Sequence, residues 1–207
     1  MQEHTIVLVH GLWEIPLLMK ILGSRLKKQK YRVVYFSYHS VLSHFSDNTE
    51  RLFAFVKQQN ADHIHLVGHS LGGLMILALL DRYSVANIKR SVIFGCPVNG
   101  SSAVRNIGER FFGKALFGKS YEPLSKGYQP LCHYDVGIIA GTGGVGLGHF
   151  FTDFSKPHDG AISIEEALIQ DDTHFIQMPV SHFNMLFSAD VAHAIASFIK
   201  NGEFKSA

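Results

Sequence analysis

The chain has 207 residues, a length that predicts a single domain spanning residues 1–207. Hydrophobic residues make up 46% and charged residues 17%, so the chain can bury a core and a disordered protein is excluded. The 19 Lys and Arg against 17 Asp and Glu give a net charge of only +2, which does not indicate nucleic-acid binding. The longest apolar run, Leu74 to Leu80, is far shorter than the ~20 residues of a membrane-spanning helix.

The amino-terminal residues and the cysteines predict a cellular location. Met1 leads at once into the apolar run Ile6–Val9, without a basic segment or a small-residue cleavage site, so we expect no secretory signal. Cys96 and Cys132 are too few for a disulfide framework and are consistent with a reducing compartment. We therefore expect a cytoplasmic protein.

Short apolar runs alternate with helical patterns along the chain. Strands are expected at Thr5–Val9, Arg32–Tyr38, Ile64–Val67, Ser91–Phe94, Val136–Ala140 and Phe175–Met178. Helices are expected at Pro16–Gln29, Asn48–Gln59, Leu71–Tyr83, Ser163–Leu168 and Met185–Ile199. Most strand runs are continuously apolar, as in parallel strands covered on both faces. This order predicts a three-layer α/β fold with about six mostly parallel strands and helices on both faces.

The segment from Val98 to Pro130 interrupts this alternation. It is longer than an ordinary connection, which favours a cap or lid inserted in the domain. Five basic residues against two acidic ones give it a positive charge. In a cap, one helical face would be apolar and turned toward the site, composed of Ile107, Phe111, Phe112 and Ala115. A crossover helix packed on the sheet remains the alternative.

The strongest motif is Gly68-His69-Ser70-Leu71-Gly72. It follows the expected strand Ile64–Val67 and opens the expected helix Leu71–Tyr83, which is the strand–turn–helix setting of a nucleophile elbow. Such a turn exposes the serine hydroxyl, while the helix N-terminus faces developing negative charge. A glycine-rich turn with a capping serine is the alternative. We predict that Ser70 is a nucleophile.

A serine nucleophile needs a base and an acid that orients the base. Only the carboxyl ends of parallel strands face a site in this fold, and His182 lies just past the last expected strand. Asp159 precedes it, which gives the order Ser, Asp, His, and Asp153 is the competing acid in the same loop. His63 and His65 could form a metal pair, but ordinary strand residues are the favoured interpretation.

The oxyanion of an acyl-transfer intermediate needs two backbone N–H donors. We expect one from Leu71, after the nucleophile, and one from Leu12, in the loop after the first strand. His10 is expected to anchor that loop by a structural hydrogen bond, and Trp13 to line the substrate pocket with Phe111 and Phe112.

A second motif, Gly141-Thr142-Gly143-Gly144-Val145-Gly146, fits a dinucleotide-binding pattern. That pattern requires the third glycine to open a helix, whereas no amphipathic helix follows here. We interpret the segment as the loop that delivers Asp159 and expect no organic cofactor and no metal.

Together these segments resemble the α/β-hydrolase superfamily, in particular small bacterial lipases, esterases and the GPI-inositol-deacylase-like group. The matching segments are Val7–Gly11, Gly68–Gly73, Gly95–Pro97 with Gly100 and Ser101, Asp159–Ser163 and Val180–Leu186. They span nearly the whole chain in the family's order, although Cys96 stands where the family commonly has Thr.

The resemblance implies a serine hydrolase of carboxylic esters that works through an acyl-enzyme. Its expected triad is Ser70, Asp159 and His182. An acyltransferase or thioesterase using the same triad is the alternative, as is a non-catalytic ligand-binding homologue. The expected partner is a small-molecule or lipid ester, with peripheral membrane contact left open, no nucleic acid, and no prediction of oligomeric state.

Overall fold

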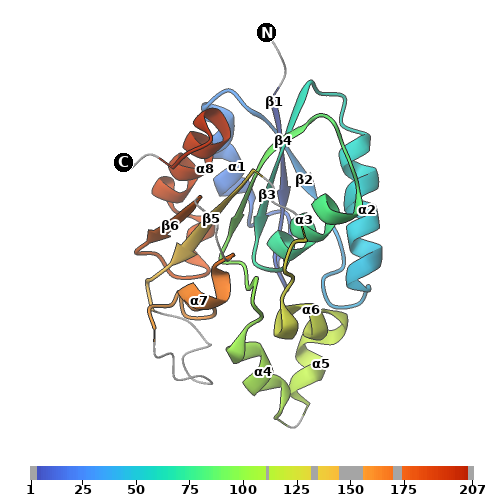
Figure 1. Ribbon diagram of the computed structural model, residues 1–207, viewed down its shortest axis with the longest axis vertical. Helices are drawn as coiled ribbons and strands as arrows, with labels where there is room; N and C mark the ends of the chain where they lie inside the picture. Colours follow the sequence, from blue (N-terminus) through green and yellow to red (C-terminus); the bar gives the residue numbers. More distant parts are fainter. Residues whose placement is uncertain (1–3, 111, 132–134, 145–155, 170–173, 205–207) are drawn as a thin grey trace.

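The computed structural model describes residues 4–110, 112–131, 135–144, 156–169 and 174–204. Its centre is a six-stranded sheet in the order β2-β1-β3-β4-β5-β6, with every neighbouring pair parallel (Figure 1). The strands are β1 (His4–Val9), β2 (Arg32–Phe36), β3 (His63–His69), β4 (Ile88–Phe94), β5 (Val136–Gly141) and β6 (Phe175–Met178). The predicted α/β fold is confirmed, and the sheet is parallel throughout.

Helices cover both faces of this sheet. One face carries α1 (Lys20–Lys28) and α8 (Ala189–Asn201), and the other carries α2 (Phe45–Lys57) and α3 (Leu71–Arg82). In α3 every residue from Leu71 to Leu79 is buried, which explains why its sequence is apolar on all sides rather than along one stripe. A short helix, α7 (Ile164–Ala167), lies against β5.

The strand order places the loops after β1 and β3 side by side. The chain passes from β1 to β2 on one side and then returns to lay β3 against the other side of β1. In parallel sheets, sites form at the carboxyl ends of the strands next to such a reversal. Val9 pairs with Gly68, so the residues that follow these two strands meet at one edge of the sheet.

The segment 98–130 forms α4 (Ser102–Gly108), α5 (Gly113–Phe117) and α6 (Tyr121–Lys126), joined by a 3₁₀ turn at Gly118–Ser120. These helices project as a group beyond the carboxyl ends of the strands (Figure 1). The single helical face predicted across Ile107, Phe112 and Ala115 is wrong, because α4 ends at Gly108 and Phe112 has a left-handed φ of 61°. Phe111 lies outside the described residues.

Two helices begin later than the sequence predicts. The first begins at Lys20 rather than Pro16, after a series of turns. The last begins at Ala189 rather than Met185, because the Ser188 hydroxyl accepts the N–H of Val191 and caps the helix there. None of the helices within the described ranges is long and apolar enough to cross a bilayer.

Candidate active site

Ser70 occupies the sharp turn between β3 and α3. Its φ of 51° and ψ of −119° lie outside the regions that residues with side chains usually adopt, as the strained elbow of this motif requires. A Cβ on Gly68 would lie 2.7 Å from the backbone of Gly72, so only glycine allows the turn to close this tightly. The serine is therefore held at the carboxyl edge of the sheet, at the first turn of a buried helix.

The same helix rests on the end of β1. A Cβ on Gly72 would lie 2.4 Å from the carbonyl oxygen of Val9, so the glycine lets the elbow approach the loop that follows β1. Leu71 is buried and Leu12 is partly buried against the core. Their backbones come from these two neighbouring loops, which is the arrangement needed for a pair of oxyanion donors.

His10 anchors the loop after β1. Its ring is buried, stacks on Tyr38 with centroids 4.3 Å apart, and has Nδ1 2.9 Å from the carbonyl oxygen of Gly11. The Tyr38 hydroxyl donates to the carbonyl oxygen of His10 at 2.8 Å. Burial lowers the pKa of His10, which favours the neutral ring. These contacts agree with the structural role expected for His10.

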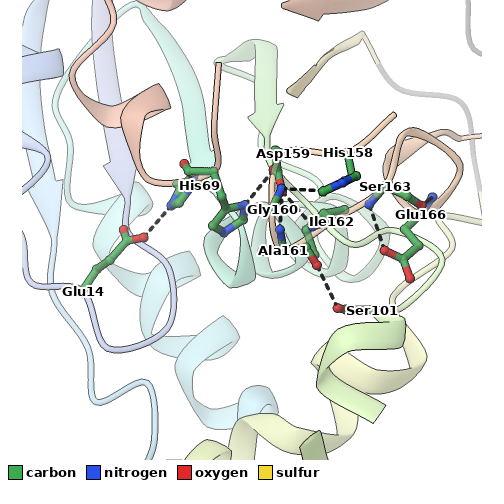
Figure 2. Close-up of polar contacts among 11 residues, drawn as sticks. Glu14, His69, Ser101, His158, Asp159, Gly160, Ala161, Ile162, Ser163 and Glu166 are labelled. Carbon is green, nitrogen blue, oxygen red and sulfur yellow. Dashed lines mark hydrogen bonds and ion pairs between the residues drawn. The ribbon is translucent and has the colours of Figure 1, made fainter. Parts of the chain in front are cut away.

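Asp159 stands in a tight turn after β5, and its carboxylate is almost fully buried. Oδ1 accepts the N–H groups of Ala161 and Ile162 at 2.8 and 2.7 Å (Figure 2). Oδ2 lies 2.8 Å from Nδ1 of His182. Burial alone would raise the pKa of Asp159, but the charge and hydrogen bond of His182, together with the two N–H groups, lower it. Asp159 is therefore an anion at neutral pH.

His182 follows β6 and is tied to the Asp159 turn twice. Besides the side-chain contact, its backbone N–H donates to the Asp159 carbonyl oxygen at 2.8 Å. Burial alone would lower the pKa of His182, but Asp159 and, to a smaller extent, Glu14 raise it. Asp159 thus keeps the proton on Nδ1 and leaves Nε2 to accept one. The competing acid, Asp153, lies outside the described residues.

A second carboxylate braces the turn that carries Asp159. The side chains of Ser163 and Glu166 form a capping box at the start of α7. Glu166 also accepts the N–H of Ser102, at the start of α4, at 2.5 Å, and the Ser101 hydroxyl donates to the Ala161 carbonyl oxygen at 3.2 Å (Figure 2). These hydrogen bonds fix the loop after β4 to the turn that carries Asp159, which we call the acid turn.

The glycine-rich segment after β5 contacts both the loop after β6 and the turn that carries Asp159. Gly143 N–H donates to the Val180 carbonyl oxygen at 3.0 Å, and Gly144 N–H donates to the His158 carbonyl oxygen at 2.8 Å. Residues 142–144 are not helical, as the interpretation of this segment as a delivery loop requires. Val145 and Gly146 lie outside the described residues.

His63 and His65 lie at the opposite end of β3 from Ser70. His65 Nε2 is 3.1 Å from His4 Nδ1, and the ring of His63 lies 4.7 Å from that of His4. Within the described ranges, no group of three His, Cys, Asp or Glu residues has the geometry to hold a metal ion.

Of the expected pocket residues, Trp13 is 58% exposed and Phe112 is 74% exposed. Trp13 joins the loop after β1 to segment 98–130: its Nε1–H donates to the Leu116 carbonyl oxygen at 3.0 Å, and its ring stacks on Phe117 at 5.7 Å. The basic residues of the segment are partly neutralised, since Lys126 pairs with Glu122 and Arg105 lies 3.9 Å from Glu166.

Glu14 is a functional candidate that no sequence pattern indicated. The residue is only 9% exposed; its Oε1 lies 2.5 Å from His69 Nδ1, and its Oε2 accepts the Gly11 N–H at 2.8 Å. The signal in the sequence was an acidic residue in an otherwise apolar loop after the first strand, two residues after the expected oxyanion donor Leu12. Its partner histidine lies far along the chain, so no local pattern identifies the pair.

Comparison with known proteins identifies the family and the fold. Residues 6–192 match the model of the alpha/beta hydrolase family, so the chain belongs to that family. No curated protein matched the sequence. Solved structures that share the fold include the esterase EaEST from Exiguobacterium antarcticum, with a TM-score of 0.70 at 12% identity, covering 97% of this chain and 94% of that one.

Two further solved structures share the fold. The lipase BlEst2 from Bacillus licheniformis has a TM-score of 0.67 at 14% identity, covering 98% of this chain and 93% of that one. A lipase-esterase related protein from Clostridium acetobutylicum has a TM-score of 0.61 at 14% identity, covering 96% and 93%.

Proposed function

We propose that this protein is a serine hydrolase of carboxylic esters. The observation that carries the proposal is the Asp159–His182 pair, whose histidine ring lies 4.6 Å from that of His69, the residue before the strained Ser70. The esterases and lipases that share its fold support the same class of reaction.

In the proposed reaction, Ser70 Oγ attacks the ester carbonyl carbon while His182 Nε2 takes the hydroxyl proton. The N–H groups of Leu12 and Leu71 hold the resulting oxyanion. His182 then protonates the leaving alcohol, and an acyl group remains on Ser70. Water, deprotonated by His182, attacks this ester, and His182 returns the proton to Ser70 Oγ as the carboxylic acid leaves. Asp159 stabilises the imidazolium that forms in both halves of the reaction.

We propose that segment 98–130 is the cap and that Trp13 and Phe112 contact the acyl chain. Trp13 connects the loop after β1 to this segment, and the ring of Phe112 is exposed on it. A series of p-nitrophenyl esters of increasing acyl length, together with acyl-CoA substrates and an alcohol acceptor, separates an esterase from a thioesterase or an acyltransferase.

The test of the function is Ser70→Ala. We expect hydrolysis of p-nitrophenyl butyrate to fall by about 10⁴-fold or more, because the nucleophile is gone. A fluorophosphonate probe should label the wild type and not this variant. Ser46→Ala, at an exposed position of α2, is the control and should keep wild-type activity. Undiminished hydrolysis or labelling in Ser70→Ala would contradict the proposal, and a wild type that binds esters without labelling would be a non-catalytic homologue.

A further inference from the structure

A second buried acid–histidine pair lies beside the catalytic one. Glu14 and His69 lie on one side of the site, and the Asp159 turn lies on the other (Figure 2). The His69 ring is fully buried, with its centroid 4.6 Å from that of His182. Its Nδ1 faces the Glu14 carboxylate, and its Nε2 lies 3.1 Å from the backbone carbonyl oxygen of His182.

These contacts determine where the protons lie. A carbonyl oxygen only accepts hydrogen bonds, so His69 Nε2 must carry a proton and donate it. A further proton lies in the short contact between Nδ1 and Oε1. Burial alone would raise the pKa of Glu14, but the charge and hydrogen bond of His69 and the Gly11 N–H lower it. The carboxylate and the ring therefore share one proton and the pair has no net charge, which is how a buried acid is tolerated here.

Glu14 also reaches the loop that supplies the first oxyanion donor. Its second oxygen accepts the Gly11 N–H, and Gly11 immediately precedes Leu12. A Cβ on Gly11 would lie 2.8 Å from Oε1 of Glu14 and 3.1 Å from Cβ of Ser70. Gly11 is thus packed between the carboxylate and the nucleophile, and a shift of Glu14 would displace this loop relative to Ser70.

We propose that Glu14 is a positioning residue. Through Gly11 it holds in place the loop after β1 that carries Leu12, and through His69 it holds the backbone of His182. This role rests on the proposed hydrolysis. Glu14 contacts the loop after β1 directly and, through His69 at the end of β3, the loop after β6. It so fixes the oxyanion donor, the nucleophile and the base relative to one another. Glu14 itself touches no reacting atom in this role.

The chemistry of the contacts distinguishes two substitutions. In Glu14→Gln, the amide oxygen can accept the Gly11 N–H and the amide nitrogen can donate to His69 Nδ1, which leaves the Nε2–H of a neutral ring directed at His182. All three hydrogen bonds then survive. In Glu14→Leu, a side chain of similar size makes none of them, and the Gly11 N–H and His69 Nδ1 lose their partner.

The test compares kcat and KM of both variants on p-nitrophenyl butyrate. We expect Glu14→Leu to lower kcat by about 10²-fold, as a misplaced oxyanion donor or base does, with KM changed only a few-fold. Glu14→Gln should restore kcat to within about 5-fold of wild type. Glu50→Leu, the same change at an exposed position of α2, is the matched control and should behave as wild type.

A double-variant cycle tests the route through His69. If Glu14 acts through this ring, Glu14→Leu combined with His69→Leu should lower kcat less than the product of the two single losses. Strictly multiplicative losses would overturn this route.

The protonation of the His69 ring is measured on the wild type, and His69→Gln identifies its signal. Nitrogen-15 imidazole spectra should show a histidine with a proton on Nε2, distinct from His182, whose signal disappears in His69→Gln. A His69 ring without a proton on Nε2 would overturn the proposal, as would a Glu14→Leu enzyme with unchanged kcat. An inactive wild type overturns the hydrolysis and this role together, whereas an active wild type beside an undiminished Glu14→Leu overturns the role of Glu14 alone.

Discussion

The acid turn at Asp159 and the loop that carries Glu14 use the same chemistry at one edge of the sheet. Each presents a buried carboxylate to Nδ1 of a histidine and accepts backbone N–H groups from its own loop. The pairs differ in what the far nitrogen of the histidine faces. His69 Nε2 faces a carbonyl oxygen, which never accepts a proton in the reaction, whereas His182 Nε2 is left for the proposed proton transfer. In the proposed mechanism, the partner of Nε2 therefore distinguishes the pair that transfers a proton from the pair that positions the backbone.

The largest expected effect comes from making the same acid-to-amide change in both pairs. Asp159→Asn should lower kcat by about 10⁴-fold, because the asparagine favours the wrong tautomer of His182 and no longer stabilises the imidazolium. Glu14→Gln should stay within about 5-fold, since its hydrogen bonds survive without charge. Steady-state kinetics on a p-nitrophenyl ester checks both. Asp153→Asn tests the competing acid. A larger loss of kcat in Asp153→Asn than in Asp159→Asn would assign the acid of the triad to Asp153.

A smaller effect is expected where the two pairs meet. Gly95 has a φ of 56°, and a Cβ there would lie 3.0 Å from Nδ1 of His182 and 3.3 Å from Nε2 of His69. Gly95→Ala should lower kcat by roughly 10²-fold, because the methyl group displaces the base. Gly144 has a comparable φ of 65°, and among the described residues no atom would lie within 4 Å of a Cβ there, so Gly144→Ala is the matched control for backbone strain. Equal losses of kcat in the two variants would show that strain, rather than contact with the histidines, is responsible.

The third effect is on pH dependence. Because the pKa of His182 is raised, kcat/KM should fall as pH drops through a value above about 6.5, where the base becomes protonated. In Asp159→Asn the main cause of the raised pKa is removed, while burial still lowers it, so His182 should titrate at lower pH. Imidazole chemical shifts of the wild type and the variant measure both values. An unchanged or higher pKa in Asp159→Asn would contradict this account of the pair.

The smallest expected effect is on segment 98–130, which contacts the loop after β1 through Trp13. Phe112→Ser should change the free energy of unfolding by no more than about 0.5 kcal/mol, because the ring is mostly exposed, yet shift the acyl-chain preference. Phe117→Ser should cost about 3 kcal/mol or more, since that ring is buried. Thermal unfolding and the ester series check the pair. A Phe112→Ser enzyme with the wild-type chain-length profile would remove Phe112 from the acyl pocket.

Part of this organisation can be predicted from short stretches of sequence. The elbow around Ser70 was predictable because a strand, a turn and a helix in direct succession fix its geometry locally. The contact between Asp159 and His182 was predictable because both residues lie beyond expected strands, at the edge where the loops of a parallel sheet meet. The apolar runs likewise predicted six strands, since burial on both faces leaves a continuous pattern that needs no long-range information.

Other features depend on contacts between distant residues. The break between α4 and α5 follows from the left-handed backbone at Phe112, which apolar periodicity does not report. Glu14 and His69 lie 55 residues apart and meet only because β3 returns to pair with β1. Chain-local patterns predicted Ser70, Asp159 and His182, in this order, as the proposed nucleophile, acid and base. The strand order alone decided which buried carboxylate faces which histidine, because hydrogen bonds between distant loops depend on the packing of the whole sheet.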